Sequence, residues 1–213
     1  MKGNTGPAII ISIMLLPLGD LGMAGTTEYK VKIAIYAAPE VKSMSHSELQ
    51  THIPSGFTGT LMEWVDPKLQ IDGLNFEFGY DTNNNPIELS SVELKLDYKA
   101  TIFMSEKIPT SSQCYDAVLK HATEHHEIDF KGLIGVSSKA EAILRESTEK
   151  MLNEYKNDLI KLKRDEQSAG TALAKEASGK IQDEIFIPIL KKSADIDTDA
   201  NYRPLAELCD QYK

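Results

Sequence analysis

The pattern of hydrophobic and polar positions changes its period near the middle of the chain. Apolar and polar side chains alternate over residues 28–37 (EYKVKIAIYA), which predicts a half-buried β-strand. Alternation returns over residues 74–80 and 87–104, and the polar segment between them, residues 81–86, predicts a turn. We therefore expect two adjacent antiparallel strands, with a break in the second near Ser90.

After residue 105 the apolar positions recur every three to four residues, as they do on one face of a helix. Ser112 precedes the first such run as a helix cap, and Ser138 with Glu141 matches the capping-box pattern. Helices are expected over residues 113–131, 138–164 and 168–187, with a short closing helix over 204–212. Strands over about 28–105, followed by helices over about 112–213, indicate an α+β fold with antiparallel N-terminal strands.

The first 24 residues have the features of an export signal. Lys2 gives a positive start, residues 8–18 (AIIISIMLLPL) form a short apolar core, and small residues at positions 22 and 24 suit cleavage after Ala24. The apolar core is shorter than the roughly 20 residues that a membrane helix needs. We therefore expect residues 1–24 to be removed and residues 25–213 to form one exported domain, periplasmic or extracellular.

The net charge of the chain argues against nucleic acid as a partner. The chain carries a formal charge of −9, whereas nucleic-acid binding needs basic patches. After removal of the leader, no apolar run is long enough to span a membrane. These observations argue against nucleic-acid and membrane-spanning partners; a peptide or protein substrate or partner is expected from the metallopeptidase-like hypothesis developed below.

Cys114 and Cys209 are the only two cysteines of the chain. In an exported protein such a pair favours a disulfide, with two reduced and buried thiols as the alternative. The bridge would close a loop of 209 − 114 = 95 residues and could stabilise the fold by up to roughly 4–5 kcal/mol on the chain-entropy model.

The segment His121-Ala-Thr-Glu124-His125-His126 holds three of the five histidines. His121 and His125 are one helical turn apart, so both imidazoles leave the same face of the predicted helix. Two neutral imidazoles at this spacing are typical ligands of a zinc ion, which makes His121 and His125 the predicted metal ligands.

A hydrolytic zinc site also needs a carboxylate that takes a proton from water. In the common His-Glu-x-x-His helix this glutamate follows the first histidine, but Ala122 occupies that place here. Glu124, directly before His125, matches the inverted His-x-x-Glu-His order, and Glu127 is the second candidate base. A structural or vestigial metal site is the alternative to a catalytic one.

The sequence does not single out a third metal ligand. Asp129 lies on the same helix face two turns beyond His121, roughly 12 Å along the axis, so it suits better the role of a hydrogen-bond acceptor that orients His125. Further third-ligand candidates are Glu141, Glu146 and Glu149 on the next helix, and His46 and His52 in the loop-rich stretch before it.

The order of elements around the histidines resembles a group of secreted bacterial proteins regarded as zinc-dependent proteases of the zincin type. The resemblance is carried by a strand over residues 96–105 (LDYKATIFMS) and a helix that opens at Cys114 and reaches His121 seven residues later, and it covers residues 90–165. It implies a zincin-like α+β domain with zinc on His121 and His125. Ala122 falls on the position of the family's catalytic glutamate.

An acidic tract near the C-terminus presents oxygen side chains at alternate positions: Asp195, Asp197, Asp199 and Asn201. A calcium loop of the EF-hand kind also requires glycine at its sixth position and glutamate at its twelfth, where this chain has Ala200 and Ala206. A solvated acidic loop is therefore favoured over a calcium site.

Two functions follow from these observations. The first is an exported zinc-binding, metallopeptidase-like protein, in which Glu124 or Glu127 would serve as base. The second is a non-catalytic binding or assembly protein that keeps the fold and uses its long helices as an interaction surface, a reading motivated by Ala122.

Overall fold

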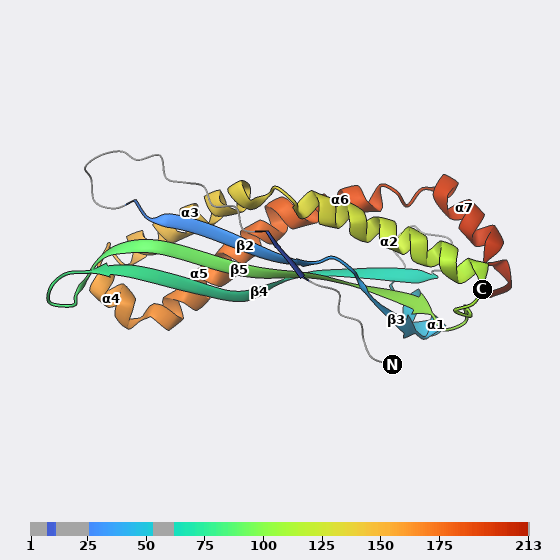
Figure 1. Cartoon of the computed structure of the whole chain (residues 1–213), viewed down its shortest axis with the longest axis horizontal. Helices are drawn as coiled ribbons and strands as arrows, with labels where there is room; N and C mark the ends of the chain where they lie inside the picture. The colour runs from blue at the N-terminus through green and yellow to red at the C-terminus, as the bar shows by residue number, and fades with distance from the viewer. Residues whose placement is uncertain (1–7, 12–25, 53–61, 213) are drawn as a thin grey trace.

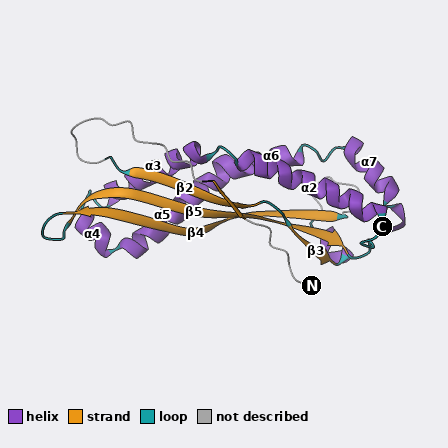
Figure 2. Ribbon diagram, in the orientation of Figure 1, coloured by secondary structure: helices purple, strands orange, loops and turns teal. Residues whose placement is uncertain are grey.

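The computed structural model describes residues 8–11, 26–52 and 62–212. Figure 1 shows an elongated molecule in which long helices run beside a narrow, twisted sheet. Helices from the second half of the chain pack along one face of this sheet, as the colouring by secondary structure in Figure 2 makes clear. The predicted α+β class is confirmed. The predicted leader lies largely outside the described residues.

Within the described residues the sheet has five strands: β1 (Ala8–Ile11), β2 (Glu28–Tyr36), β3 (Glu40–Met44), β4 (Glu63–Tyr80) and β5 (Pro86–Ser105). β5 is the central strand. It pairs antiparallel with β4 along one edge and parallel with β2 and then β3 along the other. The prediction of antiparallel strands is therefore right for β4 and β5 and wrong for β2 and β3. Alternation shows which face of a strand is buried, but it carries no information on the direction of the neighbouring strand.

The β4–β5 hairpin follows from its turn. Asp81 Oδ1 accepts hydrogen bonds from the backbone N–H groups of Asn83 and Asn85, both at 2.8 Å, and Asn84 adopts a φ of 63°. The break expected near Ser90 is a β-bulge within a continuous strand, because the pairing register shifts between Glu77 and Phe78 opposite this residue. β1, which lies in the predicted leader, pairs antiparallel with the end of β2.

The helices are α1 (His46–Gln50), α2 (Gln113–Leu133), α3 (Ser137–Glu154), α4 (Leu159–Arg164), α5 (Glu166–Ile181), α6 (Ile187–Ala194) and α7 (Asp199–Leu208). Ser112 caps α2 as predicted, since its side chain accepts from the Tyr115 N–H. The capping box at Ser138 is wrong, because the turn after α2 places the N-cap at Val136 and α3 begins one residue before Ser138. None of the helices in the described ranges is long and apolar enough to cross a membrane.

The helix predicted over 138–164 is two helices. Lys156 and Asn157 adopt φ values of 55° and 57°, in the left-handed region, and this stops α3 at Glu154. The chain restarts at Asp158, whose side chain accepts from the Lys161 N–H and caps α4. The periodic apolar positions continue through the break, so the sequence pattern does not reveal it.

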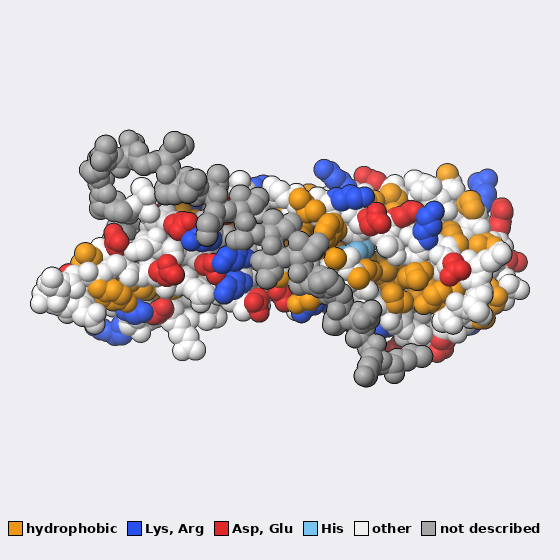
Figure 3. Space-filling model, viewed as in Figure 1, with side chains coloured by type: hydrophobic (Ala, Val, Ile, Leu, Met, Phe, Trp, Pro, Cys, Tyr) orange, Lys and Arg blue, Asp and Glu red, His pale blue; other side chains and the backbone are white. Residues whose placement is uncertain are grey.

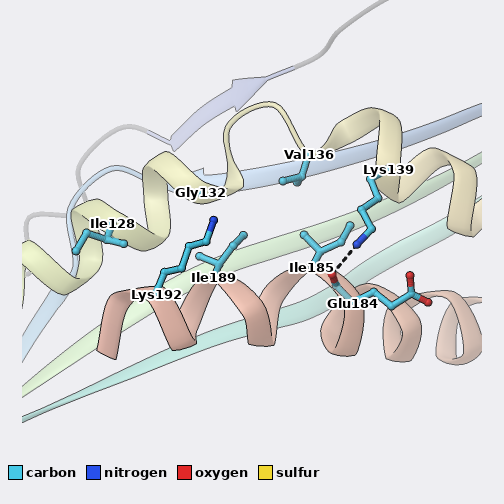
Figure 4. Close-up of a pocket in the computed structure, with 8 residues that line it drawn as sticks. All are labelled: Ile128, Gly132, Val136, Lys139, Glu184, Ile185, Ile189 and Lys192. Carbon is cyan, nitrogen blue, oxygen red and sulfur yellow. Dashed lines mark hydrogen bonds between the residues drawn. The ribbon is translucent and has the colours of Figure 1, made fainter. Parts of the chain in front are cut away.

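Between α5 and α6 the chain makes a π-helix, Gln182–Phe186. Pro188 has no N–H, so the carbonyl of Glu184 has no helical donor four residues later. The Lys139 ammonium donates to this carbonyl at 2.7 Å, as Figure 4 shows. The widened turn leaves a groove of about 260 Å³ beside Ile185 and Ile189. Of the two lysines that line the groove, Lys139 and Lys192, the first therefore already donates a hydrogen bond to a backbone carbonyl.

The core has two parts. The larger lies between the sheet and helices α3 to α6 and includes Tyr98, Leu144 and Phe186, each at most 1% exposed. The smaller surrounds the start of α2, where Ala122 packs with Val118 and with the two cysteines. Its other buried members are Met62, Ile102, Met104 and Ile108. This second cluster fixes the helix that carries the histidines.

Replacing Leu144 by alanine should lower the free energy of unfolding by about 2–5 kcal/mol, because the side chain is 0% exposed and its removal leaves a cavity. Urea unfolding followed by circular dichroism measures this change. Ile87→Ala is the control, since Ile87 is 61% exposed and its truncation should cost less than about 0.5 kcal/mol. Equal losses in the two variants would contradict the assignment of the core.

Candidate metal centre

Two histidines of α2 meet at their tips. The Nε2 atoms of His121 and His125 lie 3.3 Å apart, and the rings are nearly perpendicular, with an interplanar angle of 87°. His121 is 6% exposed and the His125 side chain 12%. The helical spacing brings the rings together as the sequence predicts, and their burial keeps most water away from them.

The third group is Asp197, which lies between α6 and α7. Its Oδ1 is 3.2 Å from His121 Nε2 and 2.9 Å from His125 Nε2. Two contacts hold this short connection in place. The Asn201 amide donates to the carbonyl of Ile196 at 2.7 Å, and the Thr198 side chain caps α7. The backbone on both sides of Asp197 is thereby fixed, which aims the carboxylate at the histidines.

These three donors fit a small divalent cation. A tetrahedral ion with bonds of 2.0–2.1 Å places its ligand atoms about 3.3 Å apart. The three distances among Nε2, Nε2 and Oδ1 are 2.9, 3.2 and 3.3 Å. Together, His121, His125 and Asp197 could hold a metal ion. Three protein ligands leave a fourth position open, as in catalytic rather than structural zinc sites.

Glu63, the first residue of β4, adds a buried carboxylate beside the group. It is 4% exposed, and its Oε1 lies 3.8 Å from His121 Nε2. Among the described residues this oxygen has no hydrogen-bond partner. Burial raises the pKa of Glu63 to about 7, and Asp197 adds to this effect, while the two histidines oppose it. A buried, unpaired carboxylate oxygen at this place is an observation that itself favours a nearby cation.

The charges of the group are strongly coupled. Burial alone would raise the pKa of Asp197, but its hydrogen bonds with His121 and His125 outweigh burial and lower it. Burial alone would lower the pKa of His121, but the hydrogen bond that its ring donates to Asp197 and the charges of Glu63, Asp197 and Glu124 raise it. The site thus favours a positive charge at the point where the donors converge.

Tyr202, from α7, closes the group on another side. Its ring lies edge-on to His121 with centroids 5.0 Å apart. Burial raises the pKa of the phenol, and the charges of Glu63 and Asp197 and a hydrogen bond with Asp197 raise it further. The hydroxyl therefore keeps its proton and makes its hydrogen bond with the Asp197 carboxylate.

The two bases predicted from sequence lie elsewhere. Glu124 and Glu127 are both exposed, and Glu127 pairs with Lys131 at 3.2 Å. Glu124 acts on His121 only through its charge. Ala122 points into the apolar cluster and is 0% exposed, so a glutamate in its place would be buried among hydrophobic side chains.

The third ligands predicted from sequence are not among the convergent donors either. Asp129 is buried, and its Oδ2 accepts from the Tyr98 hydroxyl at 3.2 Å. Glu146 pairs with Lys180 across α3 and α5. Burial raises the pKa of Glu141, which hydrogen-bonds the Val31 backbone, while Glu149 is exposed on α3. The three glutamates of α3 lie away from the histidines because α3 packs on β2 and α5 rather than beside α2.

His46 and His52 are also occupied at other places. His46 Nδ1 lies 3.4 Å from the Ser105 hydroxyl, and the His52 ring stacks on Trp64 with centroids 3.7 Å apart. Trp64 stacks in turn on Phe103 of β5.

The acidic tract does not form a single calcium-type loop. α7 begins at Asp199, so Asn201 is helical, and Asp195 is exposed. Of the tract's side chains that the structure describes, Asp197 is the one that joins the histidines in the group of convergent ligands. One feature of the sequence indicates that Asp197 can reach the histidines. A disulfide between Cys114 and Cys209 brings the C-terminal segment back to the start of α2. That bridge is present, with both cysteines buried.

No family model, curated protein or solved structure matches this chain. The geometry of its own residues therefore carries the functional argument.

Replacing Asp197 by asparagine should weaken the binding of Zn²⁺ or Co²⁺ by more than about 100-fold. Loss of a direct ligand should exceed the 10–100-fold cost of losing a supporting hydrogen bond. Isothermal titration of the metal-free protein measures the affinity. Asp195→Asn removes the same charge from an exposed neighbour and should bind metal like the unmodified chain. Equal affinities in the two variants would remove Asp197 from the site.

Loss of the disulfide in the double variant Cys114→Ser/Cys209→Ser should weaken metal binding by about 5–150-fold, a usual range for coupling between sites. The bridge holds the segment that presents Asp197 against α2, so without it the carboxylate samples more positions. The same metal titration measures this, with unfolding in chelator as the companion measurement. Unchanged affinity would show that the helix contacts alone place Asp197.

Proposed function

We propose that this protein is an exported, zinc-binding hydrolase of the metallopeptidase kind. One observation carries the proposal: three convergent nitrogen and oxygen donors lie beside a buried carboxylate oxygen that has no hydrogen-bond partner in the described part of the chain. The resemblance of the strand and histidine helix to zincins supports the same function, and so does the mixed α+β architecture.

Zinc is the ion that the donor set suits best among the common ones. Two imidazoles with one carboxylate occur in catalytic zinc sites, whereas calcium and magnesium prefer six or more oxygen ligands. The same set in an octahedral arrangement also binds ferrous iron. The donor spacings of 2.9 to 3.3 Å fit both geometries, so the preference for zinc rests on the donor types and on the small number of protein ligands.

When bound, zinc would supply the polarisation of a carbonyl group and the acidification of a water molecule. We assign to Glu63 the role of accepting the proton of an attacking water, because its carboxylate is buried beside the donors and its Oε1 lies 3.8 Å from His121 Nε2. This assigns the role of base to Glu63 in place of Glu124 and Glu127. The base then reaches the site from a neighbouring strand, which makes the alanine at position 122 compatible with hydrolysis.

Tyr202 would help to hold the Asp197 carboxylate at the metal, because its ring lies against His121 and its hydroxyl makes a hydrogen bond with Asp197. The substrate class that fits a polarising metal beside a buried carboxylate base is a peptide or protein, whose amide carbonyl needs both.

Export is part of the proposal. The buried disulfide requires an oxidising compartment for its formation in most organisms, and the first 24 residues have the pattern of a secretion signal. A periplasmic or extracellular location follows.

A second candidate function is a non-catalytic binding or assembly protein in which the metal is structural. The observation that favours it is the position of α7. Asp197 precedes this helix and Cys209 follows it, and both reach α2. A metal on the three donors would then hold the start of the C-terminal segment against α2, and the disulfide holds its end there.

Replacing Glu63 by glutamine separates the two functions. If Glu63 is the base, the variant should bind zinc and lose peptide-hydrolysis activity by about 10²–10⁴-fold. The measurement is chelator-sensitive cleavage of a mixed library of quenched fluorescent peptides, with zinc content determined on the same samples.

Glu124→Gln and Glu127→Gln are the matched controls, because each makes the same change at an exposed position of α2. Both should keep full activity. Absence of cleavage by the unmodified, zinc-loaded protein would favour the structural role, and loss of activity in the Glu124 variant instead would return the base to the helix.

A further inference from the structure

We infer that the groove beside the π-helix is a docking site for a peptide segment that carries aliphatic side chains between two carboxylates. The groove lies where α2 packs on α6, and it extends to the start of α3. π-Turns inside helices are rare and occur frequently at functional sites. None of the metal donors in the described chain lines the groove, so the inference goes beyond the proposed function and its test needs no metal.

The middle of the groove is apolar. Ile185 of the π-helix and Ile189 of α6 form its floor, and Ile128 and Val136 lie across from them (Figure 4). Gly132 allows α2 to come close to α6 here, because a Cβ at this position would lie 2.7 Å from a methyl group of Ile189. At about 260 Å³ the groove is smaller than the 300–1,000 Å³ typical of sites that enclose a whole small molecule. It therefore suits the side chains of a longer segment that lies across it.

An ammonium group lies at each end of this apolar floor. Figure 4 shows the Lys192 side chain beside Ile189 at one end and the Lys139 side chain beside Ile185 at the other. Lys139 uses one of its three donors for the Glu184 carbonyl, which leaves two for a ligand. Lys192 is exposed, and within the described chain it forms no ion pair. Both ends of the groove can therefore bind a carboxylate.

Among the residues that line the groove, Glu184 is the acidic one. Its carboxylate points away from Ile189 in Figure 4. The pKa of Lys180, on α5, is raised first by a hydrogen bond with Glu146 and further by the charge of Glu184, so this charge is partly balanced outside the groove. Figure 3 shows Lys and Arg side chains next to hydrophobic ones along the edge where α2 and α6 run. In a chain of net charge −9, such a local excess of positive charge favours an acidic partner segment.

The distance between the two ends determines the spacing of the carboxylates. Lys139 binds the carbonyl of Glu184, and Lys192 follows Glu184 by 192 − 184 = 8 residues, roughly 12 Å along a helix. An extended chain rises about 3.3 Å per residue, so the two carboxylates should be three to four residues apart. A fatty acid would place its apolar tail against the second ammonium group. A peptide segment with an acidic residue at each end matches both.

The test uses the intact, metal-free protein and the blocked peptide acetyl-Glu-Leu-Leu-Glu-amide. Isothermal titration measures binding, and ¹H–¹³C spectra of the isoleucine methyl groups locate it. The signals of Ile128, Ile185 and Ile189 should shift, whereas that of the exposed Ile87 should not. Replacing both leucines of the peptide by serine should weaken binding by about 10-fold or more, because buried apolar area is lost. Replacing both glutamates by lysine should abolish binding, since like charges then meet at both ends.

Two pairs of variants assign the contacts. Lys192→Glu should weaken binding by about 3–10-fold, whereas Lys191→Glu, on an exposed neighbour outside the groove, should change it less than about 2-fold. Ile128→Ser should weaken binding by about 5-fold or more. Its control is Ile187→Ser, which makes the same change at a side chain of α6 that is 36% exposed and does not line the groove.

Absence of peptide binding would overturn the inference, and so would equal losses in Lys192→Glu and Lys191→Glu. Octanoate that shifts the groove signals when the peptide does not would replace the peptide by a fatty acid. A protein that binds no zinc or cleaves no peptide would contradict the proposed function alone, because the titrations described here are made without metal.

Discussion

The structure around α2 depends on placing two imidazoles and one carboxylate where water scarcely reaches, with a second and more exposed carboxylate against them. His121 and Glu63 are 6% and 4% exposed, and Asp197, whose side chain is 37% exposed, bridges the two rings with one oxygen. The Glu63 carboxylate loses hydration and is repelled by Asp197, and the two imidazoles oppose this cost. A divalent cation would balance the charges of the group, which is the physical reason for regarding it as a metal centre.

The fold supplies this group from three separate parts of the chain. α2 presents the histidines, β4 begins at Glu63, and the connection after α6 presents Asp197. The smaller apolar cluster and the buried disulfide hold these parts together close to the site. The covalent link matters most for Asp197, because the acidic connection that carries it has little apolar surface of its own. Metal binding and docking of the C-terminal segment are therefore expected to reinforce each other.

Ala122 illustrates how a local motif can mislead. At the place where a zincin helix carries its glutamate, this chain buries a methyl group in an apolar cluster. Judged from the helix alone, this argues against hydrolysis. A carboxylate approaches His121 from β4 instead, and its unpartnered oxygen lies on the histidine side. The chemical requirement is a carboxylate near the donors, and the fold can meet it from any neighbouring element.

The sequence by itself determined the features that depend on near neighbours. It predicted the β4–β5 hairpin, the Ser112 cap and the paired histidines one turn apart. The disulfide, which joins residues 95 positions apart, was predicted for a different reason: the chain has only two cysteines. It missed the parallel pairing of β2 and β3 and the break after Glu154, because alternation and periodicity say nothing about strand direction and continue through the left-handed residues. Tertiary structure alone decided the rest of the site. Asp197 is 76 residues after His121, and Glu63 is 121 − 63 = 58 residues before it. Contacts at such distances arise from the packing of whole elements, which no local spacing rule can express.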